Sequence, residues 1–216
     1  MGMDDPEVLA AAGTDFVIVS RDPVEHLGAS PDVLPILPLK DTVVFPDTMT
    51  PLAVGQPRSV ALIDDILRGD KQVGLVASKR PDIEVPGPDD INTIGVLATI
   101  QKMIKAPDGT LRIIAQGVRR IRIERFTSEE PYLTAVVHDV PDVVVPGTEL
   151  EALQRNLISI YTRMIQLVPY LPDELELAAA NIDDPAALGY FIASTMRLKT
   201  EDKQELLEEI DLSKRL

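Results

Sequence analysis

Residues that carry chemistry in enzymes are few in this sequence, and their spacing does not bring them into a shared site. The chain has no cysteine, which excludes thiol catalysis, disulfides and cysteine metal sites. Its two histidines, His26 and His138, are too far apart for a His-x-x-x-His metal motif. No Gly-Lys pair is present for a phosphate-binding loop, and neither a G-x-S-x-G turn nor a His-Glu-x-x-His motif occurs. The sequence therefore predicts no catalytic, cofactor-binding or metal-binding residue and no enzymatic activity for this chain.

Pairs of adjacent carboxylates are the remaining candidates for acid–base or metal chemistry. They are Asp64-Asp65, Asp89-Asp90 and Asp183-Asp184. The three pairs are explained more simply as helix surface, loop and helix cap, respectively, because solvated carboxylates are the ordinary state of aspartate. No spacing joins one pair to another, so we assign no site to them.

One basic cluster is formed by Arg112, Arg119, Arg120, Arg122 and Arg125. It is either a patch for RNA or an acidic partner, or a set of strand arginines balanced by carboxylates such as Glu124, Glu129 and Glu130. Residues 34–140 carry 14 acidic and 13 basic side chains, so no wide positive field exists to attract a polyanion. We favour the second interpretation and expect no nucleic-acid binding through this region.

Charge is unevenly distributed along the 216 residues, whose net charge is −14. Residues 1–33 carry seven acidic side chains and one basic one, whereas residues 141–216 carry 14 acidic and seven basic side chains. Such blocks indicate segments with different roles, and their sign argues against binding to an anionic membrane. The N-terminus lacks the basic start of a signal peptide, and no apolar run is long enough to span a membrane. We therefore expect a soluble, cytoplasmic protein.

The first two segments differ in their apolar pattern. Residues 1–33 are predicted to be an acidic, flexible leader whose apolar run, Phe16 to Val19, adds an edge strand or acts as a docking or self-association strand. Residues 34–140 show strand-like alternation around one helix that begins at Pro57. Pro35 and Pro38 cannot donate to a ladder, so they place the first strand at a sheet edge or mark its start. Five or six strands around one helix predict a small, curled, mainly antiparallel sheet.

A hairpin over residues 94–117 is the clearest local unit. In its turn, at 107–109, proline fixes φ and Gly109 accepts a positive φ. Gly117 is expected to break the returning strand. The last strand is predicted over residues 132–138.

Beyond a proline-bounded linker at 141–147, the apolar period changes to that of helices. A long helix is predicted to end at Pro169, and three shorter ones follow, the last two capped by Asp184 and Thr200. The sequence thus predicts an α+β fold with a β domain over 34–140 and a helical bundle over 148–216. Asp211 is expected to cap a further helix of which residues 212–216 are the start. One isolated turn is unstable, so this end is expected to be frayed.

Several segments of the chain form a series of motifs. The series begins with LPILPLKDTVVFPDTMTPLAVGQPRSVAL at 34–62 and continues through IGVLATI (94–100), the turn at 107–109, GVRRIRI (117–123) and PYLTAVV (131–137). It reaches the helices with IDDPAALGYFIAS (182–194) and KQELLEEID (203–211). In this order, over residues 34–216 with the leader outside them, the motifs resemble the N-terminal domain of Lon-type ATP-dependent proteases. Lys40 departs from the family, which more often has arginine there.

The resemblance implies a PUA-like β domain joined to a helical bundle. In Lon proteases this region recognises unfolded, misfolded and selected regulatory proteins and supports assembly of a homohexameric ring. The ATPase module, which uses ATP and Mg, and the Ser-Lys protease module lie outside this chain, so no catalytic residue of the family can be assigned and no cofactor is expected here. The alternative is a stand-alone Lon-like adaptor. The short turn at which the chain stops favours the first interpretation.

Two methionines are the candidate substrate-contact residues. Unfolded clients offer apolar side chains, so a surface that recognises them should expose apolar groups. Met49 lies in the predicted loop 46–51 and Met103 in the strand that enters the hairpin turn, and methionine adapts readily to varied partners. The alternative for both is a place in the core of the β domain. The loop position predicts more exposure for Met49 than for Met103.

Overall fold

The structure, a computed structural model, describes residues 18–19 and 33–216. The strands are β1 (Ile18–Val19), β2 (Val33–Leu39), β3 (Thr48–Val54), β4 (Gln72–Ala77), β5 (Ile94–Lys105), β6 (Leu111–Ser128) and β7 (Thr134–Asp139). The helices are α1 (Pro57–Ile66), α2 (Thr148–Leu167), α3 (Glu174–Ala180), α4 (Pro185–Thr195), α5 (Thr200–Glu208) and α6 (Leu212–Arg215), with a 3₁₀ turn, η1, at Pro88–Asp90.

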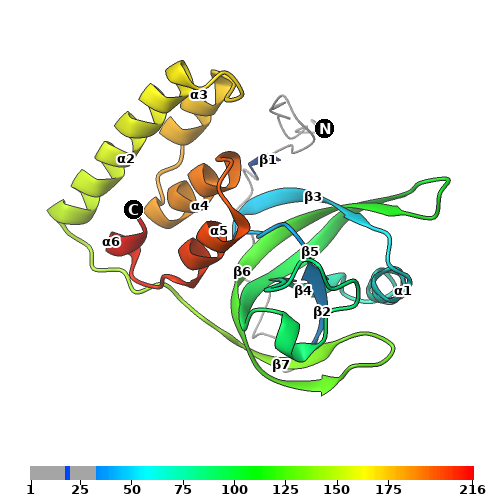
Figure 1. Cartoon of the computed structure of the whole chain (residues 1–216). Helices are drawn as coiled ribbons and strands as arrows, with labels where there is room; N and C mark the ends of the chain where they lie inside the picture. The colour runs from blue at the N-terminus through cyan, green and yellow to red at the C-terminus, as the bar shows by residue number, and fades with distance from the viewer. Residues whose placement is uncertain (1–17, 20–32) are drawn as a thin grey trace, which may run out of the picture.

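The strands form one curled sheet, and α2 to α6 gather on one side of it, away from α1 (Figure 1). The strand order is β1-β3-β6-β5-β4-β2-β7, and β6 also pairs with β7, so the sheet closes on itself. Among the described strands β2 and β4 run parallel and the other paired strands run antiparallel. The predicted α+β class and the mainly antiparallel sheet are confirmed. The part of the leader that the structure describes pairs with β3 at Met49 and Thr48, as an edge strand would.

The long strand β6 connects the parts of this sheet. Its first half pairs with β3 and its second half with β7, while β5 follows it on the other side. The hairpin of β5 and β6 turns as predicted, with Gly109 at a φ of 87°. One strand of the sheet therefore contacts three others, because it is long enough to serve two partners on the same side.

Gly117 does not break β6, contrary to the prediction; the strand runs through it. A Cβ at this position would lie 2.1 Å from the carbonyl oxygen of Phe45. The same segment also bonds to the strand, since the N–H of Asp47 donates to the Gly117 carbonyl at 3.0 Å. Glycine is needed here because the backbone at Phe45 crosses the strand. This contact comes from a distant part of the sequence, so the residues around Gly117 could not predict it.

Of the two alternatives for the prolines, an edge strand is wrong for the first part of β2, which lies between β4 and β7, whereas Pro35 does lie near the start of the strand. On the β7 side Ile36 donates to the Leu133 carbonyl at 2.8 Å, and on the β4 side the Leu39 carbonyl accepts from Ser78 at 2.7 Å. Alternate residues of a strand point the same way, so Pro38 faces away from β4 and Pro35 faces the β4 side before that ladder begins at Ile36. Neither proline removes a donor that a partner needs.

The helices contribute to two apolar cores: one that they form among themselves and one that they share with the sheet. Tyr161 and Phe191 belong to an apolar cluster formed by α2, α3 and α4, with their rings 6.2 Å apart. Tyr190 of α4 and Leu207 of α5 pack instead into the main core of the sheet, where Tyr190 stacks on Phe45 at 5.5 Å. Burial of apolar surface therefore joins the helices to the sheet.

A buried ion cluster joins the same parts through charge. Asp142, in the linker, accepts from Arg215 of α6 at 2.7 and 2.8 Å and from Arg120 of β6. The side chains of Arg120 and Arg215 are 2% and 1% exposed. Arg120 also donates to the carbonyls of Val140, Leu207 and Glu209, at 2.8 to 3.0 Å. Arg215 lies 4.2 Å over the Tyr190 ring and donates to its hydroxyl. We call Asp142, Arg120 and Arg215 the ion cluster.

The terminal helix α6 is anchored by this cluster, so the prediction of a frayed end is wrong. Asp211 caps it as predicted, accepting from the Ser213 N–H at 3.1 Å. Leu212 and Arg215 are buried. The helix–coil argument counts only interactions within the turn, whereas here tertiary contacts stabilise it. Thr200 differs from its predicted role too, because Lys199 is the N-cap of α5 and the Thr200 hydroxyl donates to the Asp41 carbonyl.

Removal of the shared carboxylate should destabilise the protein strongly. Asp142→Asn keeps the side-chain shape but leaves two buried guanidinium groups without a counter-charge, and we expect a loss of about 3–5 kcal/mol in the free energy of unfolding. Urea unfolding at pH 7 measures it. The matched control is Glu151→Gln, which removes the ion pair with Arg155, whose side chains are 65% and 75% exposed. The control should cost less than about 0.5 kcal/mol. Equal losses for the two variants would contradict the role of the ion cluster.

The same carboxylate should make stability depend on pH. Burial raises the pKa of Asp142, but the hydrogen bonds and charge of Arg215 and the charge of Arg120 outweigh it, so the pKa lies below its ordinary 3.8. A lowered pKa in the folded state stabilises the fold fully above the unfolded pKa, and this contribution disappears as the pH falls through the folded pKa. We expect the difference in unfolding free energy between wild type and Asp142→Asn to shrink below about pH 4. A difference that stays constant down to pH 2 would refute this.

Gly117→Ala tests the close approach of the backbone at Phe45. The added methyl group meets a carbonyl oxygen that cannot rotate away, so we expect a loss of about 3 kcal/mol or more in unfolding free energy. Gly69→Ala is the control, because its Cβ would lie 3.7 Å from the nearest heavy atom, the Ile66 carbonyl oxygen, at ordinary contact distance. Thermal and urea unfolding of both variants distinguish a specific clash from a general effect of replacing glycine.

Candidate functional site

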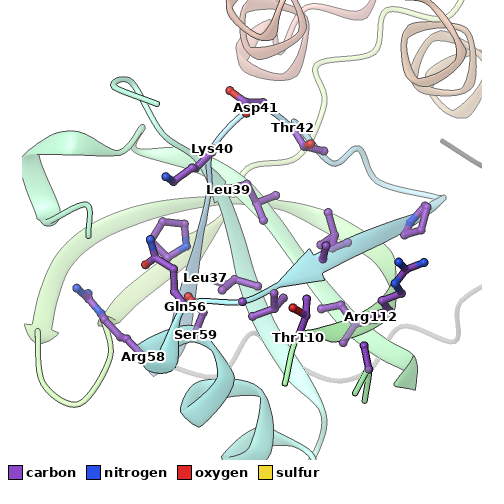
Figure 2. Close-up of a pocket in the computed structure, with 18 of the residues that line it drawn as sticks. Leu37, Leu39, Lys40, Asp41, Thr42, Gln56, Arg58, Ser59, Thr110 and Arg112 are labelled. Carbon is purple, nitrogen blue, oxygen red and sulfur yellow. The ribbon is translucent and has the colours of Figure 1, made fainter. Parts of the chain in front are cut away.

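A cleft of about 970 Å³ opens between β2 and β3 (Figure 2). Its apolar floor consists of buried side chains from three strands: Leu37, Leu39, Leu52, Val54 and Ile113. Its rim is made by the loop 40–42, the first turn of α1, the loop around Pro86 and the hairpin of β5 and β6. Its size and apolar lining are those of a ligand-binding site.

The cleft exists because the sheet closes along only part of its height. β7 pairs with β2 at Val33 to Pro35 and with the second half of β6. β3 pairs with the first half of β6. Within the described residues no strand lies between β2 after Pro35 and the facing edge of β3, and the cleft occupies this interval.

Charged side chains surround the apolar floor. The cations are Lys40, Arg58, Lys102 and Arg112, and the anions are Asp41, Glu84 and Asp108. Asp108 accepts from the Thr110 N–H at 2.9 Å, which lowers its pKa and commits it to the hairpin turn. Figure 2 shows Lys40 and Arg58 on one side of the cleft and Arg112 on the other. The rim is therefore positive by one charge in a chain whose net charge is −14.

Arg58 differs from the other rim cations. It is half-buried, and its Nη2 atom is buried without a hydrogen-bond partner among the described residues. It stands in the first turn of α1, which contains no acidic residue and whose N-cap, Gln56, makes no capping bond. The Gln56 side chain donates instead to the carbonyl of Glu84, another residue of the cleft lining. An acceptor entering the cleft would meet the positive end of a helix and a rim arginine.

The two predicted contact residues have exchanged their expected exposure. Met103 is 38% exposed on β5, beside Ile104, which is 68% exposed and lines the cleft. Met49 is half-buried in β3, paired with Ile18 and Gln116, and does not line the cleft. The expected loop is shorter than predicted, since Asp47 turns the chain with a φ of 59° and β3 begins at Thr48. Contact with a substrate remains a prediction for both methionines.

The arginines of the basic cluster point to different places. Arg120 belongs to the ion cluster, Arg119 pairs with Asp139 at 2.8 Å, and Arg112 lies on the cleft rim. For Arg119 and Arg120 the geometry agrees with arginines balanced by carboxylates, which include Asp139 and Asp142. Glu124 lies 2.7 Å from His138.

The acidic pairs are placed as their sequence context predicts. Asp65 on α1 lies 3.3 Å from Arg68, Asp90 in η1 pairs with Arg80, and Asp184 caps α4 by accepting from the Ala187 N–H at 2.8 Å. Among the described residues no group of three or more His, Asp or Glu side chains could hold a metal ion. No described helix is long and apolar enough to cross a membrane. His26 lies outside the described residues, as do Phe16 and Val17.

Sequence reasoning missed the cleft itself. Its walls come from segments that are well separated in the chain: 37–42, 51–59, 84–86 and 102–114. None of them carries a binding motif alone. One signal of the cleft was present in the sequence. Ile104 is apolar and stands directly beside Met103 near a polar turn, whereas an alternating strand of the hairpin does not require two apolar residues in a row.

Comparison with known proteins agrees with this arrangement. A family profile described as the ATP-dependent protease La (LON) substrate-binding domain matches residues 33–216. The Lon protease of Dictyoglomus thermophilum is 43% identical over 186 residues, which cover 86% of this chain and 23% of that protein. The Lon protease of Koribacter versatilis is 40% identical over 185 residues, covering 85% and 23%. The chain thus spans less than a quarter of the length of these relatives.

Solved structures share the fold. The N-terminal domain of the Mycobacterium avium complex Lon protease superposes with a TM-score of 0.69 at 24% identity, covering 85% of this chain and 93% of that one. The Lon N-terminal domain protein from Xanthomonas campestris gives a TM-score of 0.61 at 22% identity, covering 85% and 94%. The profile match and the identity to the relatives show the family, and the structures show its fold. The chain belongs to the Lon protease family, and residues 33–216 are its substrate-binding domain.

Proposed function

We propose that this chain binds extended apolar segments of unfolded, misfolded and selected regulatory proteins. It would do so in the cleft between β2 and β3 and at the adjoining tip of the β5–β6 hairpin. The observation that carries the proposal is the apolar floor of this cleft, continued outward by Ile104, next to which Met103 is also exposed on β5. Exposed apolar surface of this kind is costly for a monomer and typical of a binding surface. The names of the relatives and of the matching domain support a protein as the ligand.

The chain would serve as the N-terminal part of a Lon-type ATP-dependent serine protease in the cytoplasm. ATP, Mg and the serine nucleophile would belong to the rest of the longer protein, and this part would need no cofactor and turn over no ATP. The proposal includes no contact with nucleic acid or membrane, because the chain is strongly acidic. The names of relatives about four times as long as this chain support a protease for the whole.

The β region, residues 34–140, would be a PUA-like domain, and the helices of residues 148–216 a bundle that supports assembly of a homohexamer. The separate apolar core of α2, α3 and α4 supports a bundle. Ile160 and Leu167 on the outer side of α2 are 46% and 79% exposed, which suits a subunit contact.

Replacing the apolar residues of the hairpin should weaken client binding without affecting stability. The probe is reduced, carboxymethylated α-lactalbumin labelled with fluorescein, titrated with the protein and followed by fluorescence anisotropy. We expect Met103→Asp/Ile104→Asp to weaken binding about tenfold, because charged groups replace an apolar contact. Both side chains are exposed, so the unfolding free energy should change by less than about 0.5 kcal/mol.

Leu177→Asp is the matched control. Leu177 lies on α3, is as exposed as Ile104 at 68%, and lies outside the cleft. It should leave the affinity for α-lactalbumin unchanged. Equal weakening by both changes would mean that any loss of surface hydrophobicity reduces binding, and the cleft would then not be the binding surface.

A further inference from the structure

We propose that a bound client segment becomes a strand of the sheet: it lies extended in the cleft, bonds through its backbone to the open edge of β3, and carries acidic residues between apolar ones. This inference rests on the proposed function and adds the conformation and the sequence class of the ligand. It follows from the edges that bound the cleft and from the charges on its rim.

The edge of β3 beyond Met49 is open within the described part of the chain. On one side β3 pairs with β6 along its whole length from Met49 to Val54. On the other side β1 pairs with Thr48 and Met49 alone. Residues 51–56 all line the cleft, including residues of both pleat faces. The cleft therefore adjoins the edge of the strand rather than one of its faces.

The hairpin identifies the backbone groups that face the cleft. Ala106 donates to the Thr110 carbonyl at 2.8 Å, so Thr110 faces β5. By alternation, residues 111, 113 and 115 of β6 face β3, and their partners, residues 54, 52 and 50, face β6. Pro51 and Ala53 are left facing the cleft. Pro51 offers a carbonyl, and Ala53, whose side chain is exposed, offers both an N–H and a carbonyl.

The opposite wall is a second open edge. Pro38 of β2 faces away from β4, and β7 has ended its pairing at Pro35. Residues 37–42 line the cleft consecutively, as residues 51–56 do. In Figure 2, Leu37 and Leu39 lie between the two strands. Two partly free edges thus bound one cleft, and an extended chain between them would continue the hydrogen-bonding of the sheet, a recurring mode of peptide recognition.

The side chains of such a strand would meet two different surroundings. Alternate side chains point to opposite faces. One set would contact the apolar floor at Leu37, Leu52 and Ile113, and the other would point towards the rim. The rim carries four cations and three anions. Of the anions, Asp108 already accepts a hydrogen bond within the hairpin turn. Arg58 is a half-buried cation on this rim, and a carboxylate is the strongest acceptor for a guanidinium group. Charge complementarity therefore favours apolar residues alternating with Asp or Glu.

Ala53→Pro tests the strand edge, because it removes the one N–H that β3 turns to the cleft and leaves the bonds to β6 intact. Ala53→Thr is the matched control, since it enlarges the side chain but keeps the N–H. The probe is a fluorescein-labelled nine-residue peptide of alternating valine and glutamate. We expect Ala53→Pro to weaken binding about tenfold, as for one lost hydrogen bond in a desolvated site, and Ala53→Thr less than about twofold. Circular dichroism and urea unfolding verify that both variants fold.

Changes in the peptide test the same bond without changing the protein. N-methyl groups on alternate residues, placed in two peptides so that each blocks one edge, should abolish binding in at least one of them. Replacing glutamate by glutamine should weaken binding to wild type about fivefold but should not weaken binding to Arg58→Gln further. Equal affinities for Ala53→Pro and Ala53→Thr, or full binding of both methylated peptides, would overturn the strand inference.

Two further outcomes separate this inference from the proposed function. If the wild-type protein binds α-lactalbumin through the hairpin, but neither Ala53→Pro nor the N-methyl groups of the peptides weaken peptide binding, the proposed client binding is supported and strand addition is refuted. If wild type binds neither probe, both fail. The edge of β3 could instead pair with a second copy of this chain. Sedimentation velocity of the wild-type protein and of Ala53→Pro tests this alternative. A dimer in wild type that Ala53→Pro dissociates would show that the edge serves self-association, and would also overturn the inference.

Discussion

Two buried guanidinium groups share one carboxylate, and the relation between sheet and helices depends on this arrangement. Arg120 comes from the middle of β6, Arg215 from the last helix, and Asp142 from the segment between strands and helices. Unpaired, either cation would be very unfavourable inside the protein. The core containing Phe45, Tyr190 and Leu207 forms around the same junction. Apolar packing brings the helices to the sheet, and the ion cluster joins the three segments through one shared carboxylate.

The cleft, in contrast, depends on strand pairing that is incomplete at the edges of β2 and β3. A closed sheet has no free edge, which protects it from unwanted pairing. Here the first half of β6 pairs with β3 and its second half pairs with β7. The sheet is therefore closed at the end where β7 pairs and open at the other end. Prolines at positions 38 and 51 reduce the number of unused donors along the opening. The surface is therefore open to an extended chain without being an unrestricted edge.

Local patterns predicted the elements whose causes are local. The helix begun by Pro57, the cap at Asp184 and the turn at Gly109 each follow from a few adjacent residues, and all three agree with the structure. The errors at Gly117 and in the terminal helix have another origin. At both positions the deciding contact comes from a segment remote in sequence: the backbone of Phe45 in one case, Asp142 in the other. The cleft was missed for the same reason, since four separated segments form it.

The partners of Arg120 have a consequence for the order in which the chain folds during synthesis. Its bonds to the Leu207 and Glu209 carbonyls join residues 87 and 89 positions apart. A ribosome releases the strands first, so β6 emerges before two of the carbonyl acceptors that Arg120 uses in the folded protein have been made. Until those acceptors appear, the nascent sheet must keep this side chain hydrated. Tyr190 and Leu207 belong to the main core of the sheet, so the last helices complete this core rather than adding to a finished domain, and we expect the final surroundings of Arg120 to form only after these helices have been translated.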